Sequence, residues 1–214
     1  MILYGSSISP FVRKVLAFAA EKGIAMETKP VGVGDMNPAF RKASPLGKMP
    51  ALDDDGYMLA DSSAIVHYLE AKHPTPALIP ADPQERGRVI WFDEYGDTVI
   101  MACAAKIFFN RVVAPRFLKR AGDLEMAAAA EREELPKVFE YLESVVPEDG
   151  FLVGDSLTLA DLAVVSPLAN LAYMDMEIDA ARYPRTRAYA ERILARESFA
   201  SWLERDRSLM SRAA

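Results

Sequence analysis

Three short segments in the first third of the chain place hydroxyl, acidic and proline residues where a helix or a strand should begin. The first is Ser9-Pro10, in which proline suits the first position of a helix and serine suits the cap before it. Free N–H groups and the positive end of the helix dipole favour an anion there. Ser9 is therefore either a simple cap or a hydrogen-bond donor to a bound thiolate. Ser6, Ser7 and Tyr4 lie close by.

The second segment is Met49-Pro50, at the start of a short apolar run. A proline that opens a strand is ordinary, and its peptide bond taken alone is expected to be trans. If the bond is cis, the chain turns sharply and the N–H and C=O of Met49 point outward. An extended peptide could then pair with them as an added strand would.

The third segment is Asp61-Ser62, which precedes an apolar helical pattern. Either residue alone is most simply a helix cap. Together they could hold the two ends of an amino acid. The N–H and hydroxyl of Ser62 would bind the carboxylate, and Asp61 would bind the ammonium group.

The elements that must position these segments alternate in type over the first 72 residues. The pattern predicts strands at 2–4, 26–31, 50–52 and 57–59 and helices at 10–22, 37–43 and 61–72. A strand–helix–strand unit is parallel, whereas a tight strand–strand connection is antiparallel. The sequence therefore predicts an α/β domain with a mixed four-stranded sheet of the thioredoxin-like kind.

A proline-rich segment separates this domain from the rest of the chain. Four prolines lie between residues 73 and 83 and read as a stiff linker. Strand signals then vanish, and helical spacing predicts one long helix through Val89 and Ile107, followed by helices at 123–146, 158–173, 184–196 and 199–208. We expect domains at residues 1–75 and 83–214, joined by a linker at 76–82.

Composition limits the classes of function. With 51% hydrophobic and 26% charged residues, the 214-residue chain is of the ordinary globular kind. It has no apolar stretch of about 20 residues and no basic secretory leader, so neither a membrane span nor a membrane partner is expected. Its single cysteine, Cys103, forms no internal disulfide and favours a reducing compartment, the cytoplasm. The net charge of −6 arises entirely after residue 80, and without a basic stripe no nucleic-acid partner is expected.

Taken together, these segments resemble the soluble glutathione transferases over essentially the whole chain. Residues 9–15, Ser-Pro-Phe-Val-Arg-Lys-Val, look like the first-helix motif of the serine-using classes (phi-, tau- or zeta-like) of bacterial type. Counting back from Val15 puts Ser9 at the catalytic position of that motif, and Ser7 is the second candidate. Residues 47–52 are similar to the cis-proline segment of the family. Asp61 stands where the family usually has Glu or Gln and is shorter than Glu. Residues 151–161 resemble the buried capping motif of the second domain, with Thr158 and Asp161 as its partners.

The resemblance implies a role for each segment. Glutathione would be the co-substrate, Ser9 would activate its thiol, and no metal would take part. The residues implied to bind glutathione are Lys48, Met49, Pro50, Asp61 and Ser62, with Lys42 and Lys48 as candidates for its glycyl carboxylate. The electrophile would lie between the first helix and the long helix, against Ile8, Phe11, Phe108 and Arg111.

Three functions compete under this resemblance. The first is conjugation of glutathione to small hydrophobic electrophiles. The second is a glutathione-dependent isomerase or reductive dehalogenase on the same scaffold. The third is a non-catalytic binding or regulatory module, against which the presence of Ser9, Pro50 and Ser62 argues. The resemblance also implies a homodimer, with Tyr57 and Met58 near the seam.

Overall fold

The first part of the chain is built on a four-stranded sheet. The computed structural model describes residues 1–212, and its strands are β1 (Ile2–Tyr4), β2 (Glu27–Lys29), β3 (Ala51–Asp54) and β4 (Tyr57–Ala60). They lie in the order β2-β1-β3-β4. β1 is parallel to β2 and antiparallel to β3, which is in turn antiparallel to β4. The prediction of a mixed four-stranded sheet is confirmed.

Three helices accompany this sheet: α1 (Pro10–Glu21), α2 (Pro38–Ala43) and α3 (Ser62–Lys72). Each begins at a residue that suits a helix start. Pro10 opens α1, the side chain of Asn37 accepts the first free N–H groups of α2, and Asp61 does the same for α3. These are the helix starts that the sequence predicts.

No helix or strand is found at residues 73–82, after which a long helical segment begins. It consists of α4 (Pro83–Glu94), η1 (Tyr95–Ile100), α5 (Met101–Phe108) and η2 (Phe109–Phe117), where η1 and η2 are π-helical. A Cβ on Gly96 would lie 2.7 Å from the carbonyl oxygen of Ala163, so glycine permits the close approach of α8 (Leu159–Leu168) to η1. The sequence predicts the long helix but not its wider turns.

By length and composition alone, this segment from Pro83 to Phe117 is long and apolar enough to cross a membrane. The sequence predicts no membrane span. Core helices of soluble proteins pass the same test, and here α4 and η1 pack against α8.

The remaining helices are α6 (Leu124–Glu133), α7 (Leu135–Val145), α8 (Leu159–Leu168), α9 (Pro184–Leu194) and α10 (Glu197–Arg212), with a 3₁₀ turn, η3 (Ala169–Met174), after α8. The predicted helix at 123–146 is divided near Pro136, since proline has no N–H to donate. α8 is buried on all sides. Its start carries the predicted capping box, in which Asp161 accepts the N–H and the hydroxyl of Thr158.

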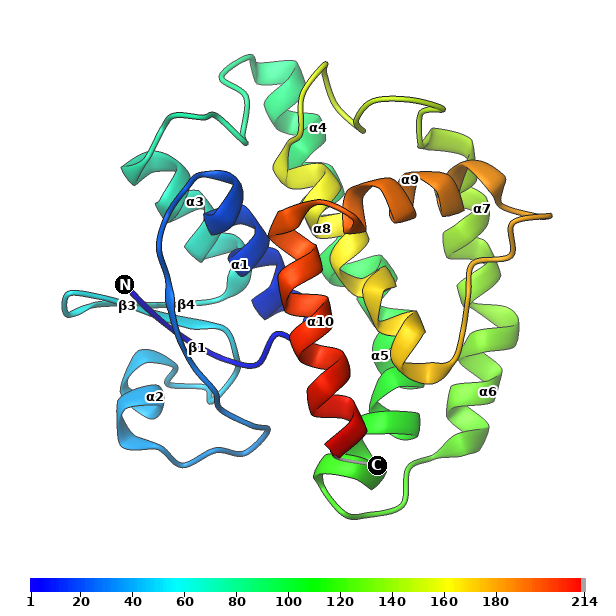
Figure 1. Cartoon of the computed structure of the whole chain (residues 1–214), viewed down its shortest axis with the longest axis horizontal. Helices are drawn as coiled ribbons and strands as arrows, with labels where there is room; N and C mark the ends of the chain where they lie inside the picture. Colours follow the sequence, from blue (N-terminus) through cyan, green and yellow to red (C-terminus); the bar gives the residue numbers. More distant parts are fainter. Residues whose placement is uncertain (213–214) are drawn as a thin grey trace.

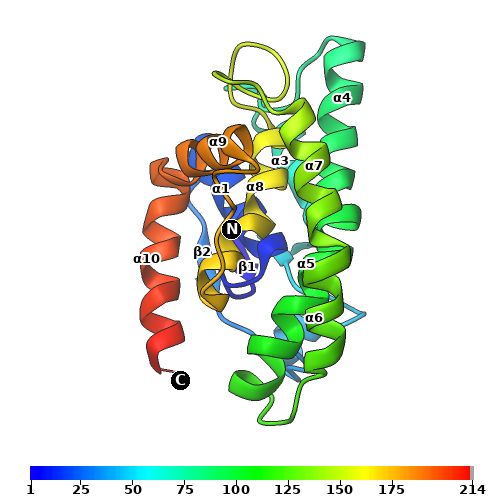
Figure 2. The ribbon, with the colours of Figure 1, turned by 90° about the vertical axis from the view of Figure 1, so that its right-hand side faces the viewer.

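The two parts share a continuous apolar core, and α1 lies against both α8 and α10 (Figure 1). Figure 2 shows α10 on one side of the molecule and α5, α6 and α7 on the other. Four ion pairs also cross between the parts: Arg13–Asp206, Lys14–Asp93, Glu21–Arg196 and Lys14–Asp97. The first two are fully buried, so α1 carries cations into the interior together with its apolar residues.

Candidate functional site

A cavity of about 290 Å³ lies where the two parts meet beside the start of α1. Its polar wall contains Ser6 and Ser9 from the loop before α1, together with Met49. The rest of the wall is apolar, from both parts of the chain: Ile8, Val31, Val33, Phe108, Val113, Phe117 and Leu118, together with Gly32. The structure therefore brings together the first two segments singled out in the sequence.

Ser9 has the geometry of a free donor at a helix start. It is half-buried, its backbone is extended, and its carbonyl accepts the N–H of Arg13 at 2.9 Å. Within residues 1–212 its hydroxyl has no hydrogen-bond partner and caps no N–H group. The hydroxyl is therefore available to an anion in the cavity.

The rival donors differ in their surroundings. Ser7 is 8% exposed, lines no part of the cavity, and donates its hydroxyl to Asp206. Tyr4 packs into a small apolar cluster, with its ring centroid 6.2 Å from that of Phe40. Ser6 does line the cavity. The structure thus makes Ser6, rather than Ser7, the nearer rival of Ser9.

The Met49-Pro50 peptide bond is cis, not trans as the residues alone favoured. Within residues 1–212 neither the N–H nor the C=O of Met49 has a hydrogen-bond partner. Ser44 braces the turn before it, because its hydroxyl accepts the N–H of Lys48 at 3.0 Å and donates to the C=O of Lys48 at 2.6 Å. Sequence reasoning missed this role of Ser44, whose only signal was its place before Pro45.

Asp61 and Ser62 lie at the start of α3. The carboxylate of Asp61 accepts the N–H of Ala64 at 3.0 Å, so the simple capping role is present. Asp61 also has a φ of 82°, a region that residues other than glycine rarely adopt and that is enriched at functional sites. Ser62 is buried and donates its hydroxyl to Asp97 at 3.1 Å.

Ser62 is thereby joined to a buried ionic group, the Lys14 cluster, which comprises Lys14, Ser62, Ser63, Asp93 and Asp97. Lys14 is 1% exposed; its ammonium group lies 2.7 Å from Asp93 and also pairs with Asp97. Burial raises the pKa of Asp97, while the charge of Lys14 opposes that rise. The cluster fixes the start of α3 against α1 and the long helix. It was not predicted, because a lysine after an arginine reads as a solvated surface.

The other predicted residues divide into two groups. Ile8 and Phe108 line the cavity, whereas Phe11 and Arg111 do not. Arg111 instead pairs with Glu131, and its Nη1 lies 3.4 Å from the sulfur of Met176. Lys48 and Lys42 are both exposed; Lys48 directly precedes the cis Met49-Pro50 bond, and Lys42 lies in α2. Sequence reasoning missed the cavity residues Val31, Val33, Val113, Phe117 and Leu118, which follow no motif.

Comparison with known proteins identifies the family to which this chain belongs. Residues 3–77 match the model for the glutathione S-transferase N-terminal domain, and residues 110–206 match that for the C-terminal domain. A glutathione S-transferase of Hyoscyamus muticus is 30% identical over 210 residues, which cover 95% of this chain and 98% of that relative. The chain belongs to the glutathione S-transferase family.

Other members of the glutathione S-transferase family agree over similar lengths. A maleylacetoacetate isomerase of Pseudomonas aeruginosa is 30% identical over 202 residues, 92% of this chain and 91% of that protein. A solved glutathione S-transferase of Methylobacterium radiotolerans, in complex with glutathione sulfonate, superimposes with a TM-score of 0.78 at 28% identity; 94% of this chain and 93% of that chain are covered. The predictions of family and of fold class are confirmed.

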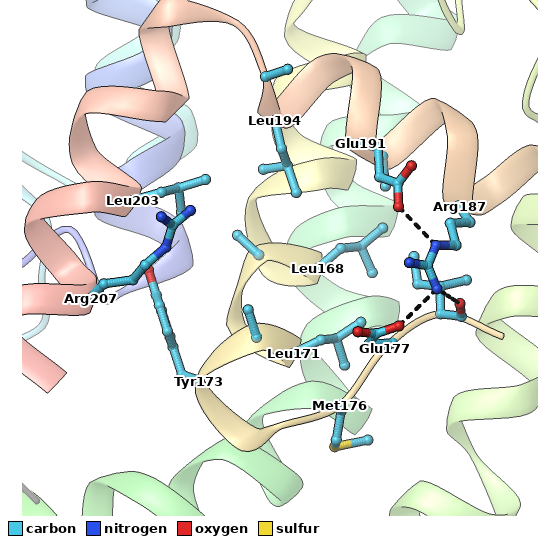
Figure 3. A pocket seen from close by; sticks show the side chains of 15 residues that line it. Leu168, Leu171, Tyr173, Met176, Glu177, Arg187, Glu191, Leu194, Leu203 and Arg207 are labelled. Atoms are coloured by element: carbon cyan, nitrogen blue, oxygen red, sulfur yellow. Dashed lines mark hydrogen bonds and ion pairs between the residues drawn. The ribbon is translucent and has the colours of Figure 1, made fainter. Parts of the chain in front are cut away.

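A second cavity, of about 400 Å³, lies between η3, α9 and α10 (Figure 3). Arg187 spans one wall, pairing with Glu177 at 2.9 Å and with Glu191 at 2.8 Å. Tyr173 and Arg207 stand on the opposite wall. The two cavities share no lining residue.

Proposed function

We propose that this protein conjugates the thiolate of glutathione to small hydrophobic electrophiles. The observation that carries the proposal is the first cavity, which is lined by Ser9 with its free hydroxyl, by Met49 with its unpaired backbone, by Ser6 and otherwise by apolar residues. A free thiol has a pKa of about 8.5 and is mostly protonated at neutral pH. A hydroxyl donor and a helix N-terminus would lower that pKa and supply the nucleophile.

In this proposal the tripeptide lies extended along the edge formed by the cis-proline turn and the start of α3. The backbone of Met49, held by Pro50, pairs with the cysteinyl residue, and Asp61 with Ser62 binds the γ-glutamyl end. Lys48 serves the glycyl carboxylate, with Lys42 as its neighbour. The electrophile lies in the cavity against its apolar wall, near Ile8 and Phe108. The lining of the cavity by these two residues supports this placement.

Glutathione is expected to raise the melting temperature of the protein in a saturable manner. A ligand that binds only the native state stabilises it by mass action. Differential scanning fluorimetry over a glutathione series, with isothermal titration, measures the effect. Absence of both heat and a thermal shift at millimolar glutathione would contradict the proposal and favour a non-catalytic module.

Replacement of Asp61 by asparagine is expected to weaken glutathione binding without unfolding the protein. A charge-assisted contact with the ammonium group contributes about 1.5–3 kcal/mol, whereas asparagine caps a helix as well as aspartate does. Isothermal titration of Asp61→Asn gives the change. Asp82→Asn is the matched control, because Asp82 caps α4 in the same way. If Asp61→Asn and the wild type have equal dissociation constants for glutathione, Asp61 acts only as a helix cap.

A glutathione-dependent isomerase is the second candidate, favoured by the relatives named maleylacetoacetate isomerase, including that of Pseudomonas aeruginosa. The two candidate activities, conjugation and isomerisation, are distinguished by measuring turnover of aryl halides, isothiocyanates, peroxides and maleylacetone-type isomers. Conjugation requires a product that carries glutathione, whereas isomerisation returns glutathione unchanged. An isomeric product formed while glutathione is neither consumed nor oxidised therefore selects the isomerase.

We also propose a homodimer in the cytoplasm. Tyr57 and Trp91 are 51% and 48% exposed, and aromatic side chains are enriched at protein–protein interfaces, which supports a partner surface. Sedimentation at micromolar concentration should give twice the chain mass of 23.6 kDa. The compartment is supported by the lone buried Cys103, which has no cysteine to pair with in its own chain.

A further inference from the structure

Asp206, in the middle part of α10, is a fully buried carboxylate held by donors from three other segments. It accepts the hydroxyl of Ser7, the hydroxyl of Tyr173 at 2.8 Å and Nη2 of Arg13 at 3.3 Å. Asp206 lines neither cavity. Its effect on a bound molecule must therefore pass through these three partners.

The residue after Ser7 is held by the same group. The carbonyl of Ile8 accepts Nδ2 of Asn170 at 3.2 Å and Nη2 of Arg13 at 3.4 Å. Arg13 in turn donates to Oδ1 of Asn170 at 2.9 Å. Ser7 and Ile8 are thus fixed from α1, η3 and α10 immediately before Ser9.

The loop before α1 has little room to move on its inner side. Gly5 has a φ of 156°, and a Cβ at this position would lie 2.5 Å from Val12. The hydroxyl of Ser9 makes no hydrogen bond within the described residues, so the backbone of this loop alone sets its position.

We propose that Asp206 is a positioning residue, which fixes the loop through Ser7 so that the hydroxyl of Ser9 meets the thiol at the start of α1. The inference rests on the proposed function of Ser9. A buried ionised carboxylate is costly, and apolar residues of similar size often stabilise a fold as well. Small displacements of a reacting group of about 1 Å can lower a rate about a hundredfold. The last helix of the chain thereby controls the thiol site from outside the cavity.

The test measures kcat, the dissociation constant of glutathione and the pH titration of the bound thiol in Ser7→Ala and Asp206→Asn. Ser7→Ala breaks the link and leaves the Arg13–Asp206 pair intact, so it carries the test if Asp206→Asn does not fold. We expect kcat to fall about tenfold, with an unchanged dissociation constant and a raised thiol pKa. Thr158→Ala is the control, since it removes a distant helix cap and should lower the melting temperature without changing kcat.

The decisive comparison repeats both substitutions in a Ser9→Ala background. If Asp206 acts through Ser9, they cause no further loss of kcat there, because coupled residues are not additive. Two results would overturn this inference and leave the proposed function standing. One is an equal loss of kcat in the wild-type and Ser9→Ala backgrounds. The other is an unchanged kcat when the substitutions are made in the wild-type protein and that protein is active. A wild-type protein that binds no glutathione would overturn the proposed function and this inference with it.

Discussion

Replacing Ser9 by alanine is expected to lower kcat by about 10²–10³ while glutathione still binds, as loss of one preorganised anion donor does elsewhere. The hydroxyl of Ser9 lines the cavity and has no partner within residues 1–212, so it is free to stabilise the thiolate. Without it the pKa of the bound thiol rises toward its free value, and less nucleophile exists at neutral pH. Raising the pH should therefore restore part of the activity.

The thiolate absorbance of bound glutathione as a function of pH measures this effect directly. Ser6→Ala is the matched variant, because Ser6 lines the same cavity three residues earlier. The titration should shift in Ser9→Ala and stay in place in Ser6→Ala. The reverse pattern assigns the donor to Ser6, and no shift in either variant contradicts the serine mechanism.

Replacing Lys14 by methionine is expected to cost about 3–5 kcal/mol of the free energy of unfolding, the usual cost of removing one partner from a buried ion pair. Methionine fills a similar volume but leaves the carboxylates of Asp93 and Asp97 facing each other without their cation. The structure around the start of α3 depends on this cluster, so affinity for glutathione should fall as well.

Urea denaturation of Lys14→Met gives the change in stability. Arg187→Met is the comparison, since Arg187 also pairs with two carboxylates but at the surface, where such pairs contribute about 1 kcal/mol or less. A loss for Lys14→Met no larger than that for Arg187→Met would mean that water reaches the cluster and that the buried charges are not structural.

The features that follow from neighbouring residues were predictable. Ser9-Pro10 and Asp61 predicted two helix starts, and the order of strands and helices predicted the mixed sheet. The capping box of Thr158 and Asp161 was equally legible, because both partners lie within four residues. Such local signals depend on propensity and hydrogen bonding that the sequence displays directly.

The features that depend on distant partners were not predictable. Arg13 and Lys14 interrupt the apolar face of α1 and read as surface charges, yet they pair with Asp206 and Asp93. Nothing in the sequence near α1 reveals those carboxylates. The apolar wall of the cavity was not predictable either, because its residues come from distant segments. Phe117, for example, lines the cavity from the π-helical segment η2. Arg111, which lies in the same π-helical segment, pairs with Glu131 and does not line the cavity.

The four ion pairs that link α1 to the helical part limit how this chain can recombine with its relatives. A crossover within residues 73–82 would join the sheet and α1 to a helical half from another protein. Such a hybrid would bury Arg13 and Lys14 against whatever that half presents, and unpaired buried charges cost more than a small domain can tolerate. Hybrids should fold only when the incoming half supplies acids at the places of Asp93 and Asp206. A crossover in this segment is therefore expected to be tolerated only between halves whose buried charges match.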